Sequence, residues 1–270
     1  INQIRTAMSS VIVGQERMVD LLLTVILAKG HVLIEGVPGV AKTLMARMMA
    51  KLVDAQFSRI QFTPDLMPSD VLGTSVFNLK TSEFNFHKGP VFADIVLVDE
   101  VNRAPAKTQS ALFEVMEERQ ATVDGVTYKM NPLYTILATQ NPVEQEGTYK
   151  LPEAQLDRFI MKITMQYPTL EEEVTILERH HSNLKLTALE DIKPILTGQE
   201  LLQLCDYVGR VYIDPTLLRY IAMIIQQTRT SKAVYLGASP RASVGLMQAA
   251  KAFALLQGRD FITPDDVKFI

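Results

Sequence analysis

The feature that most constrains the fold is a glycine-rich segment, GVPGVAKT, at residues 36–43. Residues 31–35 (HVLIE) before it have the composition of a β-strand, and residues 41–52 have a helical pattern. A tight turn from a strand into a helix directs backbone N–H groups and a helix N-terminus at one point, which is how proteins hold phosphate. The segment therefore predicts an α/β fold with a phosphate-binding loop after its first strand.

Two side chains in this segment have specific chemistry. The Lys42 ammonium can contact the β- and γ-phosphates of a nucleotide, and the Thr43 hydroxyl can ligate magnesium. The usual pattern places glycine before the lysine, whereas this chain has Ala41. We expect the loop to survive, because alanine adds one methyl group and still allows right-handed backbone angles. The predicted nucleotide-binding residues of this segment are Gly36, Val37, Pro38, Gly39, Val40, Ala41, Lys42, Thr43 and Leu44.

Further strands are predicted at residues 57–62, 95–99 (IVLVD) and 133–139, with a helix at residues 106–119. The IVLVD run hardly alternates between apolar and polar residues, which is typical of a central parallel strand buried on both faces. Strands that alternate with helices in this way predict a parallel sheet flanked by helices, joined by right-handed crossovers.

Polar residues follow two of these strands. Asp99 and Glu100 end the IVLVDE run, and Asn141 comes shortly after the strand at residues 133–139. Ligands of open α/β sheets bind at the carboxyl edge of the strands. We expect Asp99 to hold magnesium through its water shell and Glu100 to orient the attacking water. Asn141 would lie beside the γ-phosphate, where its amide can donate to phosphate and accept from water.

The strands disappear beyond Pro168. This change predicts a nucleotide-binding domain at residues 1–167 and a smaller all-α domain at residues 168–270. The chain starts at Ile1 and stops within two turns of a strong helix start at Thr263, so we expect both ends to be truncated. Helices are predicted at residues 170–181, 198–208, 215–230 and 239–256 and from residue 264 onward.

Two segments, residues 73–89 and 120–130, fit neither pattern. Both alternate like strands, and the second carries Asp124-Gly125 between its alternating runs, a strong β-hairpin signal. Such hairpins are either surface decoration or loops that touch a partner or substrate, and the sequence leaves both interpretations open.

The composition narrows the function classes. The 270 residues are 47% hydrophobic and carry a net charge of −3, so no global basic field indicates nucleic-acid binding. The only cysteine is Cys205, which excludes an internal disulfide and suits a reducing cytoplasm. The apolar run at residues 21–28 is too short to cross a bilayer, so no membrane insertion is expected. We interpret His180 and His181 as part of a helix face and not as metal ligands. Met45, Met48 and Met49 are expected to fill the core.

Five segments occur in an order that resembles the MoxR group of AAA+ ATPases, and the resemblance covers nearly the whole chain. They are GVPGVAKT, IVLVDEVNRA, ILATQNPVEQEGTY, LPEAQLDRF and GASPRAS. The resemblance implies an AAA+ core with a helical lid, and ATP or ADP and Mg²⁺ as ligands. The two hairpin segments match the inserts that mark this wider clade.

The resemblance also implies site roles. Arg158, in LDRF, matches the arginine finger that acts on ATP bound to a neighbouring subunit. Arg241, in GASPRAS, matches the sensor 2 residue, and the sequence leaves open whether it acts within its own subunit. The remaining matches are Lys42 and Thr43 to Walker A, Asp99 and Glu100 to Walker B, Asn141 to sensor 1, and Val13, Gly14 and Gln15 to the adenine pocket. Arg103 and Arg119 are further candidates for contacts between subunits.

Proteins of this group are thought to be chaperone-like ATPases that form hexameric rings. They mature or activate other proteins, often one with a von Willebrand A domain. The sequence therefore predicts an ATPase that remodels a partner protein. A nucleic-acid motor like the MCM helicases, a magnesium chelatase motor subunit and a nucleotide-bound scaffold with negligible hydrolysis remain alternatives.

Overall fold

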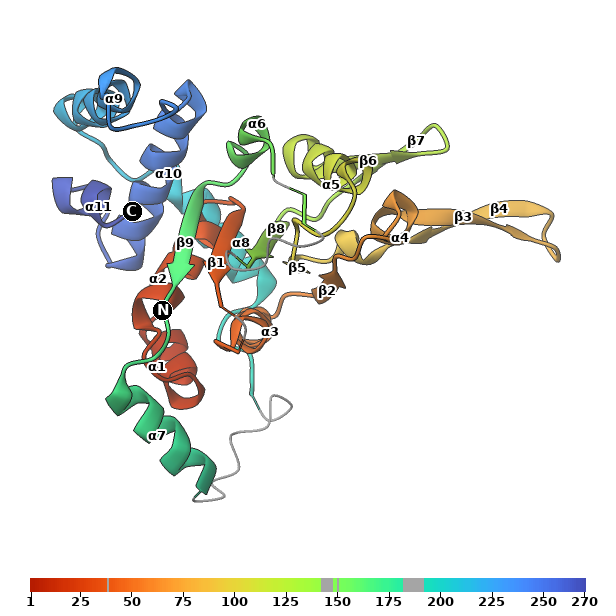
Figure 1. The fold of residues 1–270 in the computed structure, drawn as a ribbon, viewed down its shortest axis with the longest axis horizontal. Coiled ribbons are helices and arrows are strands. Elements are labelled where there is room, and N and C mark those ends of the chain that lie inside the picture. Colours follow the sequence, from red (N-terminus) through yellow and green to blue (C-terminus); the bar gives the residue numbers. More distant parts are fainter. Residues whose placement is uncertain (38, 142–147, 150, 182–191) are drawn as a thin grey trace.

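A five-stranded sheet forms the centre of the molecule (Figure 1). The computed structural model describes residues 1–37, 39–141, 148–149, 151–181 and 192–270. All neighbouring strands are parallel, in the order β2-β5-β8-β1-β9, which confirms the predicted parallel sheet. The strands are β1 (Val32–Gly36), β2 (Phe57–Gln61), β5 (Ile95–Asp99), β8 (Thr135–Gln140) and β9 (Met161–Met165). The edge strand β9 was not among the predicted strands.

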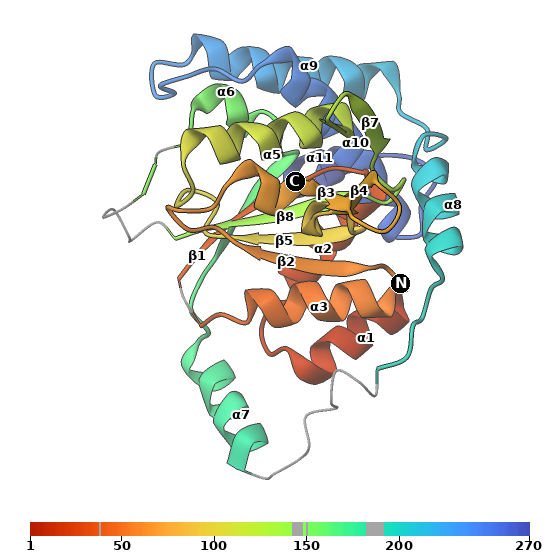
Figure 2. The same ribbon diagram turned by 90° about the vertical axis from the view of Figure 1, so that its right-hand side faces the viewer.

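Helices cover both faces of the sheet, and the strand side chains alternate between two apolar clusters. In β5, Ile95 and Leu97 join one cluster, whereas Val96 and Val98 join the other. The first cluster includes α1 (Asn2–Val11), α2 (Glu16–Leu27) and α3 (Lys42–Leu52). The second includes residues of α4 (Pro68–Leu72) and α5 (Ala106–Glu118). Figure 2 shows α3 and α5 on opposite sides of the strands. The IVLVD strand is buried on both faces, as its sequence predicts.

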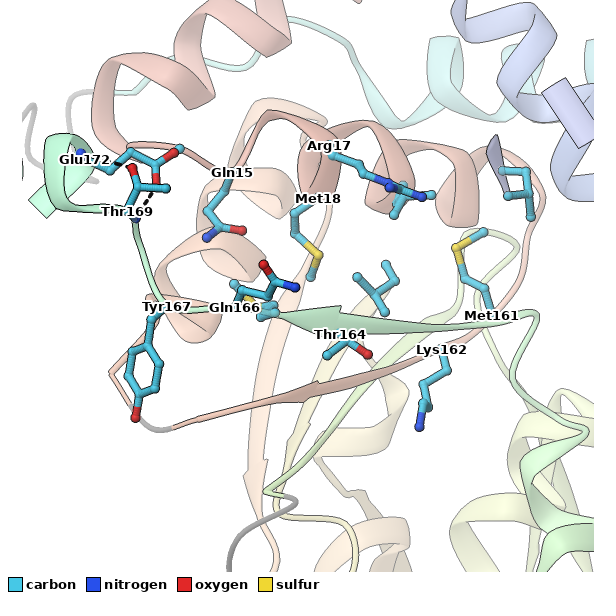
Figure 3. Close-up of a pocket in the computed structure, with 15 residues that line it drawn as sticks. Gln15, Arg17, Met18, Met161, Lys162, Thr164, Gln166, Tyr167, Thr169 and Glu172 are labelled. Carbon is cyan, nitrogen blue, oxygen red and sulfur yellow. Dashed lines mark hydrogen bonds between the residues drawn. The ribbon is translucent and has the colours of Figure 1, made fainter. Parts of the chain in front are cut away.

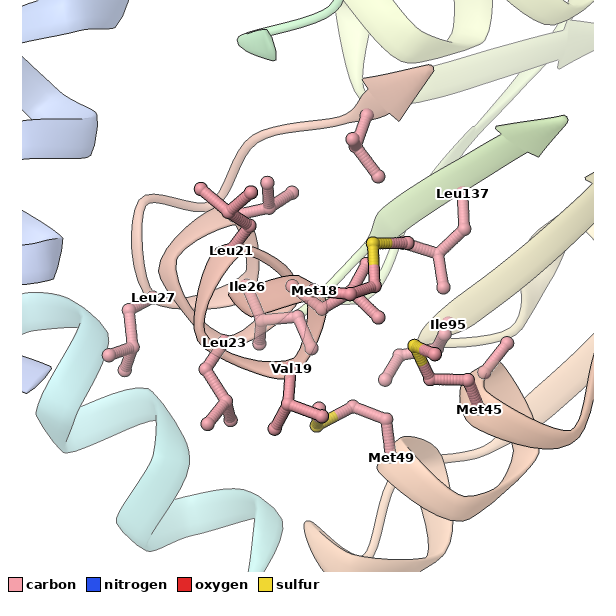
Figure 4. Close-up of a cluster of buried hydrophobic side chains, with 14 of the residues drawn as sticks. Met18, Val19, Leu21, Leu23, Ile26, Leu27, Met45, Met49, Ile95 and Leu137 are labelled. Carbon is pink, nitrogen blue, oxygen red and sulfur yellow. The ribbon is translucent and has the colours of Figure 1, made fainter. Parts of the chain in front are cut away.

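The apolar run at residues 21–28 lies almost wholly in α2, where Leu21 to Leu27 are all buried. Figure 4 shows Val19 and Leu23 of this helix near Met49 of α3, within the cluster that also contains Met45. Met45, Met48 and Met49 are at most 1% exposed, which confirms their place in the core. From Leu21 onward α2 is buried on every side, so this part of its sequence has no exposed polar face that would reveal a helical period. Within the described residues, no helix is long and apolar enough to span a membrane.

All five predicted C-terminal helices are present. They are α7 (Leu170–His181), α8 (Gly198–Val208), α9 (Pro215–Thr230), α10 (Pro240–Leu256) and α11 (Pro264–Phe269). Helix α10 faces two ways: Ala249 and Phe253 join the cluster around α2, while Ala250 and Ala254 join a small cluster with α9 and α11. The lid helices thus share an apolar core with the α/β part, and the division at residues 167 and 168 stays a prediction.

Both predicted hairpins are present. They are formed by β3 (Gly73–Asn78) with β4 (Glu83–Lys88), and by β6 (Gln120–Val123) with β7 (Val126–Lys129). Asp124 and Gly125 have φ angles of 51° and 78°, as a tight two-residue hairpin turn requires. Figure 1 shows both hairpins projecting from the side of the molecule that faces away from α9 and α11.

A buried histidine ties α5 to the sheet next to β1. His31 Nδ1 accepts the backbone N–H of Ile136 at 2.9 Å, so Nε2 carries the proton that points at the Met116 carbonyl, 3.2 Å away. The pKa of His31 is lowered to about 3, mainly by burial and then by the charge of Arg119, while the hydrogen bond to the Met116 carbonyl opposes the shift. The imidazole is therefore neutral in the folded protein at neutral pH.

Acidification from pH 7 to pH 5 is expected to destabilise the fold through His31. Between the ordinary pKa of 6.5 and the folded value of about 3, the unfolded chain binds a proton that the folded chain does not. Stability therefore falls as pH decreases through this window, by about 2 kcal/mol at pH 5. Urea unfolding at both pH values measures the loss. His31→Gln should remove this part of the pH dependence, whereas His87→Gln in the exposed β4 strand should not. An unchanged pH dependence in His31→Gln would assign the acid sensitivity to other groups.

Candidate functional site

The carboxyl ends of the three central strands bring the predicted site residues to one edge of the sheet. Gly36 ends β1, Asp99 ends β5, and Asn141 directly follows β8. These strands are neighbours and parallel, so their ends lie side by side. A Cβ on Gly36 would lie 2.9 Å from the Cβ of Met165 in β9, so the close approach of these strands favours glycine there. Asn141 is 9% exposed, at the end of a strand buried along most of its length.

The Lys42 side chain folds back onto the predicted phosphate loop. Its Nζ donates to the Gly36 carbonyl at 2.7 Å, which closes the loop on itself. Burial lowers the pKa of Lys42, while the carboxylates of Asp99 and Glu100 raise it. The ammonium therefore lies in the field of both acids. Thr43 follows it in the first turn of α3.

Ala41 corrects one expectation. The sequence favoured right-handed backbone angles for this residue, but its φ and ψ angles are 56° and 22°, in the left-handed region. Such a conformation costs an L-residue roughly 1–2 kcal/mol, which a glycine would not incur. Gly39 also has a positive φ, 86°, so the loop turns twice through this region before its backbone enters α3. Successive turns of this kind point backbone N–H groups inward, as in anion-binding nests. Pro38 lies outside the described residues.

Thr139, near the end of β8, holds the two acids together. Its hydroxyl donates to Asp99 Oδ1 at 3.1 Å and accepts the backbone N–H of Glu100 at 3.0 Å. Glu100 has a φ of 56°, a strained conformation for a non-glycine residue that costs of order 1–3 kcal/mol. The chain thus turns sharply between the two acids. As a result Asp99 is buried, whereas Glu100 is only partly buried.

Three further polar residues contact these acids, and each was either not predicted from the sequence or given another role. Arg59 Nε donates to Asp99 Oδ2 at 2.6 Å, and Gln61 Nε2 donates to Glu100 Oε2 at 2.9 Å. Both come from β2, which pairs with β5 in register. Arg103, predicted as a contact between subunits, lies with its Nε 3.1 Å from Glu100 Oε2. The alternation of β2 could have indicated that Arg59 and Gln61 share a face, but not which residues they meet.

The predicted adenine-binding segment lies next to the phosphate loop. A cavity of about 250 Å³ is lined by Val13 and Gln15, by Val40 and Leu44 of the loop region, and by Ile176 of α7. Its walls are largely apolar, which suits a planar base. Val37 packs against the core cluster that includes α2 and α3.

Gly14 lines a separate cavity of about 490 Å³ between α2 and the edge strand β9 (Figure 3). Gln15 borders both cavities, and Glu172 accepts the backbone N–H of Thr169 beside the second one. The structure therefore brings Val13 and Gln15 to the phosphate loop and turns Gly14 toward β9. The φ of Gly14 is 72°, which allows this turn.

Arg158 and Arg241 lie at the opposite edge of the sheet. Arg158 lies shortly before β9, which begins at Met161. In a parallel sheet all strands begin on one side and end on the other, so Arg158 lies on the side away from the carboxyl ends. Arg241 lies in the first turn of α10 and contacts Glu117, near the C-terminal end of α5. The structure thus brings these two arginines together and separates them from Lys42, Glu100 and Asn141 of the same chain.

Arg119, the other candidate for a contact between subunits, is engaged within its own chain. Its guanidinium donates to the backbone carbonyls of Tyr134, at 3.3 Å, and Lys29. Its backbone is left-handed, with a φ of 49°, because it caps α5 before the β6–β7 hairpin. Among the described residues, no group of three or more His, Cys, Asp or Glu side chains could hold a metal ion.

The chain combines a parallel sheet, a glycine-rich loop between β1 and α3, an acid pair at the end of β5 and a helical lid. This combination defines a P-loop ATPase of the AAA+ class. Comparison with known protein families agrees. Residues 31–161 match the family described as "ATPase family associated with various cellular activities (AAA)", and residues 226–270 match the AAA lid domain.

Relatives define the class further. The chain is 49% identical to the uncharacterised protein YeaC of Bacillus subtilis, over 96% of this chain and 80% of that protein. It is 46% identical to Chaperone MoxR1 of Mycobacterium tuberculosis, over 95% of this chain and 69% of that protein. The crystal structure of a candidate ATPase from Cytophaga hutchinsonii superposes with a TM-score of 0.90 at 43% identity, covering 99% of this chain and 83% of that one. The chain belongs to the MoxR family of AAA+ ATPases.

Proposed function

We propose that this chain hydrolyses ATP at a site shared by two subunits and uses the cycle to remodel a partner protein. One observation supports the proposal: Lys42 and Glu100 lie near the carboxyl ends of the strands, whereas Arg158 lies near their amino ends, together with Arg241. The strand that separates them, β9, has five residues and is therefore about 16 Å long. Arg158 and Arg241 would act on ATP bound to the next subunit, and repetition of this head-to-tail contact closes a ring, which we propose to be hexameric.

Within one subunit, the chain supplies the phosphate loop and the group that handles water. Lys42 would leave the Gly36 carbonyl and contact the β- and γ-phosphates, because its ammonium is already in place at the loop. Glu100 would accept a proton from the attacking water, and Asn141 would orient that water against the γ-phosphate. Val13 and Gln15 would hold the adenine in the apolar cavity beside α7.

Magnesium suits the donors present. Asp99 offers carboxylate oxygens and Thr43 a hydroxyl, the oxygen ligands that this ion prefers. Asp99 already accepts from Arg59 and Thr139, so it is oriented before any ion binds. A bound magnesium ion would neutralise charge on the β- and γ-phosphate oxygens.

The shared site predicts complementation between two inactive variants. Lys42→Ala removes the phosphate half and Arg158→Ala removes the arginine half, so each variant alone should hydrolyse little ATP. Mixed in equal amounts, subunits that exchange freely should place an intact half beside an intact half at about a quarter of the interfaces. Steady-state ATPase activity of the mixture measures the recovery. No recovery from subunits shown to exchange would contradict a site shared in this way.

A second mixture of variants tests whether Arg241 acts on its own subunit or on the neighbouring one. If both arginines serve the neighbour, a mixture of Arg158→Ala and Arg241→Ala subunits stays inactive, because every interface between them lacks one arginine. If Arg241 served its own subunit, that mixture would recover activity and our assignment would be wrong.

The β3–β4 hairpin is the surface that we assign to the partner protein. Phe77 and Phe84 pack with ring centroids 5.1 Å apart, and Leu79 near the turn is 86% exposed. Exposed apolar side chains of this kind at a projecting tip mark interaction sites. The named chaperone among the relatives supports a protein client, and we propose a client or activator of the von Willebrand A-domain type.

A nucleic-acid motor is the alternative that this proposal must exclude. The net charge is −3, and residues 120–130, which include the β6–β7 hairpin, contain only Lys129 as a positive charge. ATPase activity that DNA stimulates with a steep salt dependence would favour the motor over our proposal. A cytoplasmic location remains a prediction from the single cysteine.

A further inference from the structure

Glu117 lies between the two arginines that we assign to the neighbouring ATP. Its carboxylate accepts two hydrogen bonds from Arg241, from Nη1 at 2.9 Å and from Nη2 at 2.6 Å. The Nε of Arg158 lies 3.9 Å from Glu117 Oε2. One carboxylate on α5 therefore contacts a guanidinium from the connection between α6 (Glu153–Leu156) and β9, and another from the lid helix α10.

Two electrostatic effects disfavour this arrangement of the two arginines unless an acid lies nearby. Arg241 occupies the first turn of α10, where the positive end of the helix dipole disfavours a cation. Arg158 is anchored more firmly, because its Nε donates to the Phe113 carbonyl at 3.2 Å and its Nη1 to the Ala154 carbonyl at 3.1 Å. Without an acid between them, the two positive charges would repel each other. Glu117 offsets both effects at once.

The geometry leaves donors for a phosphate. A guanidinium has five N–H groups, and the bidentate contact with Glu117 uses one on each terminal nitrogen of Arg241. The Arg241 side chain is 51% exposed, and a cavity of about 540 Å³ opens beside Glu117, Arg158 and Arg241. Arg241 can therefore bind an incoming phosphate oxygen while Glu117 still holds it.

We propose that Glu117 is a positioning residue that presents Arg158 and Arg241 as one unit to the γ-phosphate of the neighbouring subunit. The inference rests on the proposed shared site and adds a residue to it. The contact also joins the lid to the α/β part, so a shift of either arginine is transmitted to the other through the same carboxylate. Glu117 would thereby act on hydrolysis in the next subunit and not in its own.

Glu117→Gln tests the proposal, since the amide keeps the size of the side chain and removes its charge. We expect kcat for ATP to fall about 10- to 100-fold with KM changed less than about threefold, because the arginines act mainly on the transition state. Glu117→Asp, which keeps the charge, should recover part of the loss. Glu118→Gln is the matched control: it removes the same charge from the next residue of α5, whose side chain forms no hydrogen bond or ion pair with the other described residues.

Mixed assemblies separate positioning from a general loss of structure. Glu117→Gln subunits mixed with Lys42→Ala subunits should regain activity, because the Lys42→Ala subunit presents intact arginines to the intact ATP site of its neighbour. Glu117→Gln mixed with Arg158→Ala should stay inactive, since both defects lie on the same half. An inactive first mixture would overturn the proposal and indicate a structural role instead.

The two proposals fail in different ways. Normal turnover in Glu117→Gln, with Arg158→Ala and Arg241→Ala both inactive, would overturn the role of Glu117 and leave the shared site intact. Normal turnover in Arg158→Ala and Arg241→Ala would overturn the shared site itself.

Discussion

Lys42→Ala is expected to abolish ATP hydrolysis and to weaken ATP binding at least about 100-fold, because truncation removes a half-buried charge from the phosphates. The ammonium lies at the phosphate loop, in contact with the Gly36 carbonyl and in the field of Asp99 and Glu100. Its loss leaves those two acids facing the phosphates with one cation fewer. Titration with a fluorescent ATP analogue measures the affinity, and phosphate release measures turnover.

A second lysine on the same helix provides the control. Lys51 lies in the last turn of α3, at the end remote from the loop. Lys51→Ala should therefore keep both binding and turnover, while changing the net charge by the same amount. Undiminished affinity in Lys42→Ala would show that the nucleotide phosphates bind elsewhere.

Glu100→Gln is expected to lower kcat by about 10³-fold while ATP affinity changes less than threefold, which is the range for removal of a general base. Glutamine has nearly the same shape and can still accept the hydrogen bond from Gln61, but it cannot take a proton from water. Single-turnover kinetics with bound ATP isolate the chemical step from product release. Because the variant holds ATP without turning it over, it is also the form in which a client complex should persist.

Two control variants accompany Glu100→Gln. Glu114→Gln, in the exposed part of α5, removes one acid of the same kind and should leave turnover at the wild-type level. Arg103→Ala tests the pairing of Arg103 with Glu100: loss of that contact frees the carboxylate without removing it, so it should alter kcat far less than Glu100→Gln does. Wild-type turnover in Glu100→Gln would remove Glu100 from its proposed role.

Local sequence patterns predicted most of the fold. Four strands of the sheet, both hairpins and all five C-terminal helices follow from period and turn chemistry, as in the Asp124-Gly125 turn. The strand β9 was missed, although its residues alternate in burial. It is short and lies at the edge of the sheet, where exposed polar residues such as Lys162 interrupt the apolar residues. The helix α2 was missed for the opposite reason, because its second half, from Leu21 to Leu27, is buried throughout and has no exposed polar face to mark a helix.

The candidate site divides in the same way. The sequence could place Lys42, Asp99, Glu100 and Asn141, because each lies at or shortly after the end of a recognisable strand, and parallel strands end at one edge of the sheet. The left-handed backbone of Ala41 was not predictable, because the side chain alone favours the other region and the close wrap of the loop overrides it. Arg59 and Gln61 were missed since only the pairing of β2 with β5 brings them to the acids.

By itself, the sequence determined the class of the protein and predicted the residues proposed to hold the phosphates, because those residues lie within a few positions of recognisable strand ends. Only the tertiary structure decided where Arg158 and Arg241 lie, since they are separated by 83 positions along the chain and meet on one carboxylate, Glu117. The physical reason is that a strand and the polar residues at its end are adjacent in the chain, so a local pattern is enough to place them. The contact between α5, the α6–β9 connection and α10 depends on how the lid packs onto α2, which no local pattern records.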